Sequence, residues 1–193
     1  MVNSSHRWAV QLCQEALRED PARLSHCLAV GEASSAVAQE LGDVDSSLLA
    51  AAGVLHDIGY APNLVQTGQH AIDGARYLAS LGISEEIVSL VAHHSCATIE
   101  ARIRGLSHLM RDFRSPHPAA LDILTFADMT TGPSGKNVTV QERFRDIRFR
   151  YQPQSVTWHF LDTAATCLQQ AAGSVAARRE LVRQHQRSAG SIR

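Results

Sequence analysis

Helical periodicity constrains the fold of this chain more than any other feature of its sequence. Apolar residues recur at spacings of three and four, and Pro, Gly and capping residues divide this pattern into separate segments. Helices are expected over residues 21–42, 46–59, 68–81, from 84 onward, around 121–127, from 139 onward and over 156–185. No alternation typical of β-strands persists for more than a few residues. The sequence therefore predicts an all-α fold.

The length of 193 residues suits one domain with a sizeable core. We expect a helical segment at 1–19 and, at 151–193, a C-terminal helix packed on the same domain, with a tail that frays from Ser188. Residues 97–117 are expected to form a surface excursion, because Gly105 and Pro116 interrupt the helical pattern there.

Charge and hydropathy exclude several classes of function. The formal net charge is −1, with acids and bases interspersed, so the basic footprint of a protein that binds nucleic-acid polymers is missing. No apolar run approaches the roughly 18 residues that a membrane span needs, and no apolar segment typical of a secretory signal follows the N-terminus. We therefore expect a cytoplasmic protein that acts on a small molecule.

The four cysteines are expected to be reduced and buried. Cys13, Cys27, Cys96 and Cys167 are scattered, form no CxxC pair and mostly have apolar neighbours. This pattern favours buried thiols over a disulfide framework.

Histidines and aspartates lie at or near the apolar side of several predicted helices. They are His26, His56, Asp57, His70, His94 and Asp128, whereas His93 is about 100° around its helix from His94. Each histidine alone is best explained as a buried core residue. Asp57 is more telling, because a carboxylate near a helix C-terminus, among apolar residues, needs a positive partner. Together these side chains predict a metal site in the core of a bundle.

The order and spacing of these residues resemble a known family. His26, then His56-Asp57, then Asp128 match the H…HD…D order of the HD-domain metal-dependent phosphohydrolase superfamily, and residues 56–59 read HDIG, the signature of one of its branches. The resemblance covers about residues 20–150. His70 and the His93-His94 pair match the extended pattern of binuclear members. The resemblance implies an HD-domain helical bundle with its metal site in the bundle core.

The resemblance also implies a role for each residue. One metal ion would bind to His26, His56, Asp57 and Asp128, and a second to His70, His93 and His94, with Asp57 as the bridge. His56 and Asp57 would be the catalytic residues, and a metal-activated water would hydrolyse a phosphate ester or anhydride of a nucleotide or other small metabolite. Mixed imidazole and carboxylate ligands favour two divalent ions among Fe, Mn, Co, Ni and Zn.

Three further residues are candidates for binding a small phosphorylated substrate. Arg23 is one helical turn before His26, Tyr60 follows the HDIG signature, and Lys136 is the only lysine of the chain. The arginines at 143, 145, 148 and 150 have helical spacing and are expected to form a solvated face. The sequence leaves the substrate and the oligomeric state open, a dimer included.

Departures from known branches leave the reaction open. Ser95-Cys96-Ala97 follows the paired histidines where cyclic-dinucleotide phosphodiesterases have Gly-Tyr-Pro, which disfavours that activity. Diadenosine tetraphosphate hydrolases have a similar general plan, but the 14 positions from His56 to His70 are fewer than theirs. Two alternatives remain: a mixed-valent di-iron oxygenase, which oxygen uptake would reveal, and a non-catalytic nucleotide-binding regulatory module, inactive on a panel of phosphate esters.

Overall fold

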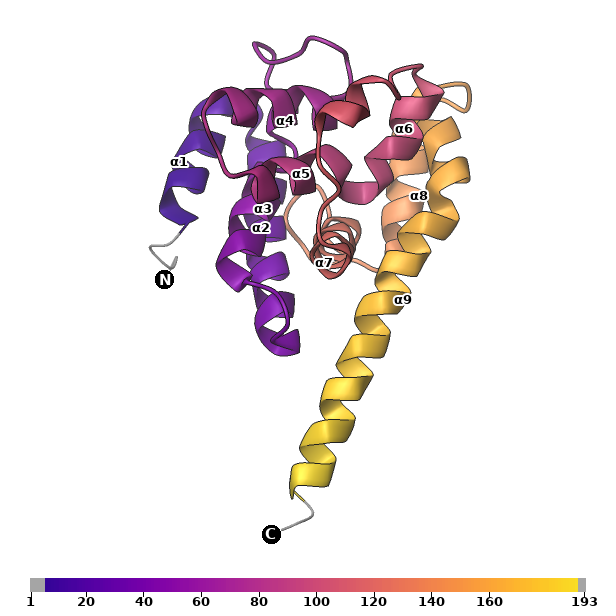
Figure 1. Ribbon diagram of the computed structural model, residues 1–193. Coiled ribbons are helices and arrows are strands. Elements are labelled where there is room, and N and C mark those ends of the chain that lie inside the picture. The colour runs from indigo at the N-terminus through magenta and orange to yellow at the C-terminus, as the bar shows by residue number, and fades with distance from the viewer. Residues whose placement is uncertain (1–5, 191–193) are drawn as a thin grey trace.

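A computed structural model describes residues 6–190, and it confirms the predicted all-α fold (Figure 1). No β-strand occurs within these residues; Thr131 and Asn137 form one isolated bridge. The elements are α1 (Arg7–Ala16), α2 (Pro21–Leu41), α3 (Ser46–Leu55), η2 (Ile58–Tyr60), α4 (His70–Ser80), α5 (Glu85–His93), η3 (His94–Cys96), α6 (Ala97–Ile103), η4 (Leu109–Asp112), α7 (Pro118–Met129), α8 (Val140–Arg150) and α9 (Val156–Gly190).

The predicted helix boundaries hold where a capping residue defines them. The Asp20 carboxylate accepts a hydrogen bond from the Arg23 backbone N–H at 2.9 Å, at the start of α2. Gly42 ends α2 with a φ of +74°, a left-handed conformation that glycine adopts without strain. Thr139 and Glu142 form the predicted capping box of α8.

Helices α2 and α3 form the centre of the bundle. Their backbones meet at two glycines: a Cβ placed on Gly53 would lie 2.8 Å from the Gly31 Cα. One apolar cluster joins this pair to α1, α4 and α5, and a second joins it to α7 and α9. The close approach holds the sides of α2 and α3 that carry His26 and His56 against each other, with ring centroids 5.3 Å apart.

Three expectations about the elements were wrong. The second predicted helix ends at Leu55 and not near Gly59, because the chain turns at His56 into η2. Residues 97–117 are not simply a surface excursion, since α6 packs against α9 and buries Ala97, Glu100 and Ala101. The last helix extends past the expected end at 185 to Gly190; the rest of the predicted frayed tail, 191–193, lies outside the described residues, as does the start of the N-terminus, 1–5.

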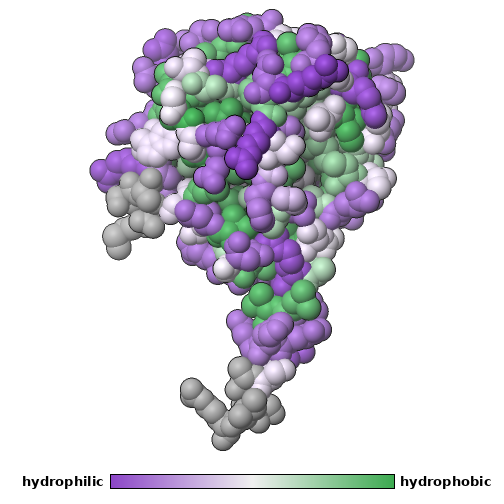
Figure 2. All heavy atoms as spheres, viewed as in Figure 1, coloured by the Kyte–Doolittle hydropathy of each residue, from purple (hydrophilic) through white to green (hydrophobic). Residues whose placement is uncertain are grey.

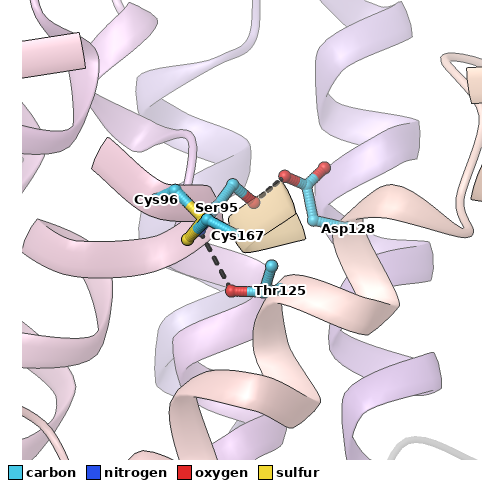
Figure 3. The surroundings of a disulfide bond; sticks show 5 residues. All are labelled: Ser95, Cys96, Thr125, Asp128 and Cys167. Atoms are coloured by element: carbon cyan, nitrogen blue, oxygen red, sulfur yellow. Dashed lines mark hydrogen bonds between the residues drawn. A yellow bond between two sulfur atoms is a disulfide. The ribbon is translucent and has the colours of Figure 1, made fainter. Parts of the chain in front are cut away.

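The expectation of four reduced cysteines was wrong for one pair. Cys96, in η3, forms a disulfide with Cys167, in α9, across 71 positions of sequence (Figure 3). Packing of α9 against η3 brings the two thiols together, and sequence spacing gives no sign of such a contact. Cys13 and Cys27 are free and buried, as predicted.

The surface is mostly polar on the face that Figure 2 shows, with hydrophobic patches between the polar residues and one on the projecting end of α9. Helix α9 runs beside α7 and then extends beyond the bundle (Figure 1). Within residues 6–190, no helix is both long and apolar enough to cross a membrane.

Candidate metal centre

Side chains from five parts of the fold meet in the core of the bundle. They are His26 from α2, His56 and Asp57 from the turn after α3, His70 from the start of α4, His94 from η3 and Asp128 from the end of α7. Most are buried, and His70 keeps a partly exposed edge. Histidine and aspartate side chains from separate helices and turns therefore share one small volume.

Three of the imidazoles are oriented by backbone carbonyls. The Nδ1 atoms of His26, His56 and His94 lie 3.2, 2.7 and 2.7 Å from carbonyl oxygens of Gly132, Gly53 and Val91, to which an Nδ1–H donates. In the neutral ring this hydrogen bond places the proton on Nδ1, so that Nε2 keeps its lone pair. Hydrogen bonds from Nδ1 to a carbonyl oxygen are typical of histidines that bind metals through Nε2.

The Nε2 atoms converge on the two carboxylates. Asp128 Oδ1 lies 3.1 Å from His26 Nε2 and 3.8 Å from His56 Nε2. Asp57 Oδ1 lies 3.5 Å from His56 Nε2, 3.3 Å from His70 Nε2 and 3.8 Å from His94 Nε2. Asp57 therefore joins His70 and His94 to His56, and Asp128 joins His56 to His26.

The cluster fits a bound metal ion. His56 Nε2 is buried and has no hydrogen-bond partner among the described residues, an arrangement that is costly unless a ligand binds there. Two groups of potential ligands share this atom: His26, His56 and Asp128, and His56, Asp57 and His94. Within each group the ligand atoms lie within 4.8 Å of one another. Imidazole nitrogens and carboxylate oxygens of this kind suit a divalent transition metal.

Burial and charge favour the protonation states that a metal site needs. Burial lowers the pKa of His56 to about 4 and that of His70 to about 3, so both rings are neutral at pH 7. Although burial alone would raise it, the pKa of Asp57 lies below its usual range because His56, His70 and Arg23 surround the carboxylate. The pKa of Asp128 is lowered in the same way, against burial, by His26 and His56.

The positive partner predicted for Asp57 is Arg23. Its Nη1 donates to Asp57 Oδ2 at 2.5 Å, and its guanidinium lies 3.6 Å from the centre of the Tyr60 ring. The Tyr60 ring in turn stacks on His70, with centroids 4.2 Å apart. Two of the three predicted substrate-binding residues therefore lie beside the cluster, each in contact with one of its members.

Two predicted site residues lie apart from this cluster. His93 is half-buried, its Nδ1 lies 2.9 Å from the Ser89 carbonyl oxygen, and it belongs to neither group of potential ligands in the described chain. Lys136 is exposed in the loop between α7 and α8 and does not line the cavity above the cluster. The roles assigned to these two residues stay predictions.

Ser95 is a site residue that the sequence did not reveal. Its Oγ donates to Asp128 Oδ2 at 2.5 Å, and its backbone N–H donates to Thr125 Oγ1 at 3.2 Å (Figure 3). Its φ of +47° is unusual for a residue other than glycine, and Cys96, with a φ of +60°, shares this feature. A backbone conformation of this kind leaves no mark in a sequence pattern.

Gly59 explains how His70 reaches Asp57. A Cβ on Gly59 would lie 2.0 Å from the His70 carbonyl oxygen and 2.5 Å from the Gly74 N. Any larger residue would push η2 and α4 apart. The glycine of the HDIG signature is thus needed for packing beside the cluster.

A cavity of about 300 Å³ opens above the cluster. Asp57, His70, His94 and Asp128 line it from the bundle, together with Arg23 and Tyr60. Arg104, which directly follows α6, also lines it, as do Arg143, Ile147 and Arg150 of α8, Tyr151, and Phe160 of α9. The expectation of a solvated face was therefore wrong for Arg143, whose side chain is 12% exposed, whereas the arginines at 145, 148 and 150 are exposed as expected.

Comparisons with known proteins agree with this geometry. The HD domain family matches residues 23–130, more than half of the chain. Ribonuclease Y of Opitutus terrae is 34% identical over 98 residues, which are 50% of this chain and 18% of that protein. Ribonuclease Y of Mesoplasma florum is 36% identical over 98 residues, 50% of this chain and 19% of that protein. The matched region thus spans less than a fifth of these relatives, and no solved structure matches.

Proposed function

The chain belongs to the HD domain family of metal-dependent phosphohydrolases, and on that premise we propose that it hydrolyses a small phosphate ester or anhydride at the core cluster. The observation that carries the proposal is the convergence of Nε2 atoms on Asp57 and Asp128, with His56 Nε2 buried and unpaired among the described residues. Such a set of atoms has little other use than to bind cations.

We propose that two divalent ions bind at this cluster. His26, His56, Asp57 and Asp128 would hold the first ion and His70 and His94 the second, with Asp57 as the bridge. Bound ions would supply a Lewis acid and an activated water for attack at phosphorus. His93 is kept apart from this set because, within the described residues, it makes no contact with Asp57 or Asp128, whereas each of the other four imidazoles lies within 4 Å of at least one of them.

The residues around the cluster would orient the substrate and hold its charge. Arg23 lies over Tyr60 and beside Asp57, where its guanidinium is placed to bind a phosphate oxygen. Tyr60 is 40% exposed and covers His70, so it would form one wall of the site. Lys136 stays a candidate for binding a distal phosphate only if its loop folds over the cavity.

The cavity favours a small substrate over a polymer. About 300 Å³ is at the lower limit of sites that enclose small molecules, and the net charge of −1 gives no broad basic surface for a nucleic acid. The similarity to two ribonucleases favours a second candidate, hydrolysis of RNA phosphodiesters. We propose the small ester as the substrate and a cytoplasmic setting for the reaction.

One experiment separates these candidates. Protein purified without oxygen would be assayed with added Mn²⁺, Fe²⁺ or Co²⁺ on nucleoside monophosphates, nucleoside triphosphates, bis(p-nitrophenyl) phosphate and a short RNA oligonucleotide. Metal-dependent release of phosphate from the monophosphates, abolished by a chelator, is expected. Cleavage of RNA alone would favour the second candidate. Inactivity on every ester with all three metals would contradict both.

A further inference from the structure

One wall of the cavity, formed by residues of α8 and α9 and by Tyr151 between them, comes from a part of the chain that the family match does not include. The HD domain match ends at residue 130, whereas α8 begins at Val140 and α9 at Val156. In Figure 1 these two helices lie together at the side of the bundle, next to α6. The residues that this chain adds beyond its family core therefore cover its candidate metal centre.

Arg143, near the start of α8, is the residue of this wall that reaches deepest. Its side chain is only 12% exposed, and its Nη2 lies 3.8 Å from Asp128 Oδ1, too far for a hydrogen bond. Its Nη1 makes one long contact of 3.5 Å with Asp146 Oδ2. Its Nε is buried and has no hydrogen-bond partner in the part of the chain described.

The other arginines of the cavity are better paired. Arg104 Nε donates to Glu100 at 2.7 Å and Arg150 Nη2 donates to Asp146 at 2.8 Å. Within the described residues, Arg23 shares the buried, unpartnered Nε, but its Nη1 donates to Asp57 at 2.5 Å, whereas the one hydrogen bond of Arg143 is 3.5 Å long. A guanidinium with five N–H donors that is almost buried and so poorly paired carries a large desolvation cost. An anion that enters the cavity would supply the missing acceptor.

We propose that Arg143 binds a phosphoryl oxygen of the substrate, and that α8 and α9 select which esters are hydrolysed. This inference rests on the proposed function and deepens it. Ile147, Tyr151 and Phe160 line the cavity beside Arg143 and present apolar and aromatic surface. The substrate class that fits is a compact phosphomonoester whose organic group is planar or apolar, with a nucleoside monophosphate as the leading example.

Binding of inorganic phosphate to the metal-loaded protein tests the role of Arg143. The variant Arg143→Gln is compared with Arg145→Gln, an exposed arginine of the same helix that does not line the cavity. Loss of a charge-assisted hydrogen bond is expected to weaken phosphate binding at least tenfold in Arg143→Gln and to leave Arg145→Gln at the wild-type value. Bound metal per chain is expected to be unchanged in both.

Two results would overturn the inference. They are equal phosphate affinity in the two glutamine variants, and loss of metal from Arg143→Gln, which would make it only a positioning residue for Asp128. The lysine variant keeps the charge but not the planar fork, so weaker phosphate binding is expected there too. The lysine variant also tests the role of Arg143 if the glutamine variant does not fold. Phosphate binding that depends on Arg143 in a protein inactive on all esters would refute the proposed function and the selection of esters by α8 and α9, and would leave only Arg143 as a phosphate-binding residue.

Discussion

At the scale of single residues, this site is built by hydrogen bonds that fix the orientation of each ligand. His26, His56 and His94 are each held through Nδ1 by a carbonyl, and Asp128 is held through Oδ2 by Ser95. The identity of the ligands follows from the sequence pattern. Their orientation does not, because it depends on the carbonyl of Gly132, a residue 106 positions from His26, and on the unusual backbone at Ser95.

Removal of the Ser95 hydroxyl tests whether this orientation matters. In Ser95→Ala the Oδ2 atom of Asp128 loses its partner, so the carboxylate is less fixed toward His26. We expect the affinity for metal to fall by about ten- to a hundredfold, measured by competition with a chelating dye. Ser80→Ala, an exposed serine bonded to the Tyr77 carbonyl, is the matched control. Equal metal affinity in the two variants would show that Ser95 does not orient Asp128.

The buried histidines predict how the stability of the metal-free protein depends on pH. The pKa values of His56 and His70 are lowered by burial from about 6.5 in the unfolded chain to about 4 and about 3. Between pH 6.5 and 4 the unfolded chain therefore binds protons that the folded chain does not. Each ring costs about 1.4 kcal/mol of stability for every pH unit of acidification in that window.

His26 partly offsets this loss. Its pKa is raised because its contact with Asp128 outweighs burial, so it stabilises the folded state below pH 6.5. The lowered pKa values of Asp57 and Asp128 change the free energy of unfolding with pH only below about pH 4, where the carboxylates of the unfolded chain bind protons. Urea denaturation with a chelator present should show a free energy of unfolding that falls from pH 6.5 to 4.5, with a shallower fall in His70→Asn. A constant or rising value would contradict these pKa shifts.

At the scale of elements, close contacts between helices bring the ligands together. Helical periodicity predicted the helices that carry the ligands, and caps such as Asp20 and Thr139 fixed where several of them begin. Periodicity did not predict the turn at His56, because the apolar run continues through Ile58. It also did not predict that α8 covers the cavity, since a row of arginines has the pattern of an exposed face.

The contact at Gly59 can be tested by a single methyl group. In Gly59→Ala the new Cβ would lie 2.0 Å from the His70 carbonyl, so η2 and α4 must separate. We expect a loss of about 3 kcal/mol in the free energy of unfolding and weaker metal binding. Gly173→Ala in α9 is the matched control, because its Cβ meets nothing within 4 Å. That variant should be stabilised by up to about 1 kcal/mol. Similar stability of the two variants would refute the close contact.

The disulfide between η3 and α9 links the turn that carries His94 and Ser95 to the helix that bears Phe160. It closes a loop over 71 positions, which in the chain-entropy model corresponds to at most about 4 kcal/mol. A reductant is expected to lower the melting temperature of the wild-type protein but not that of Cys167→Ser. In the unfolded chain, before a reductant is added, reagents that label thiols should not react with Cys96. Labelling of all four cysteines without a reductant would refute the bond.

At the scale of the whole molecule, the chain adds a C-terminal pair of helices to an HD domain. The bundle that the family match covers holds all the candidate ligands, and α8 and α9 lie against it and form the far wall of the cavity. The predicted boundaries at 19/20 and 150/151 stay proposals, and the second of them separates α8 from α9 although both line one cavity. Sequence patterns of this kind bring out candidate metal ligands, because ligand chemistry admits few residue types. They indicate the substrate poorly, because a cavity wall can be built from many residue types.

Metal content and activity of Asp57→Ala test the central claim most directly. Asp57 lies within 4 Å of three imidazoles, those of His56, His70 and His94, whereas Asp128 lies within 4 Å of two. The wild-type protein, purified without oxygen, is predicted to hold about two metal ions per chain and to release phosphate. Asp57→Ala is predicted to lose metal and to lose activity by at least a hundredfold, whereas Asp162→Ala, at the surface beside Arg148, should keep both. Wild-type protein without bound metal, or phosphate release that survives in Asp57→Ala, would contradict the account.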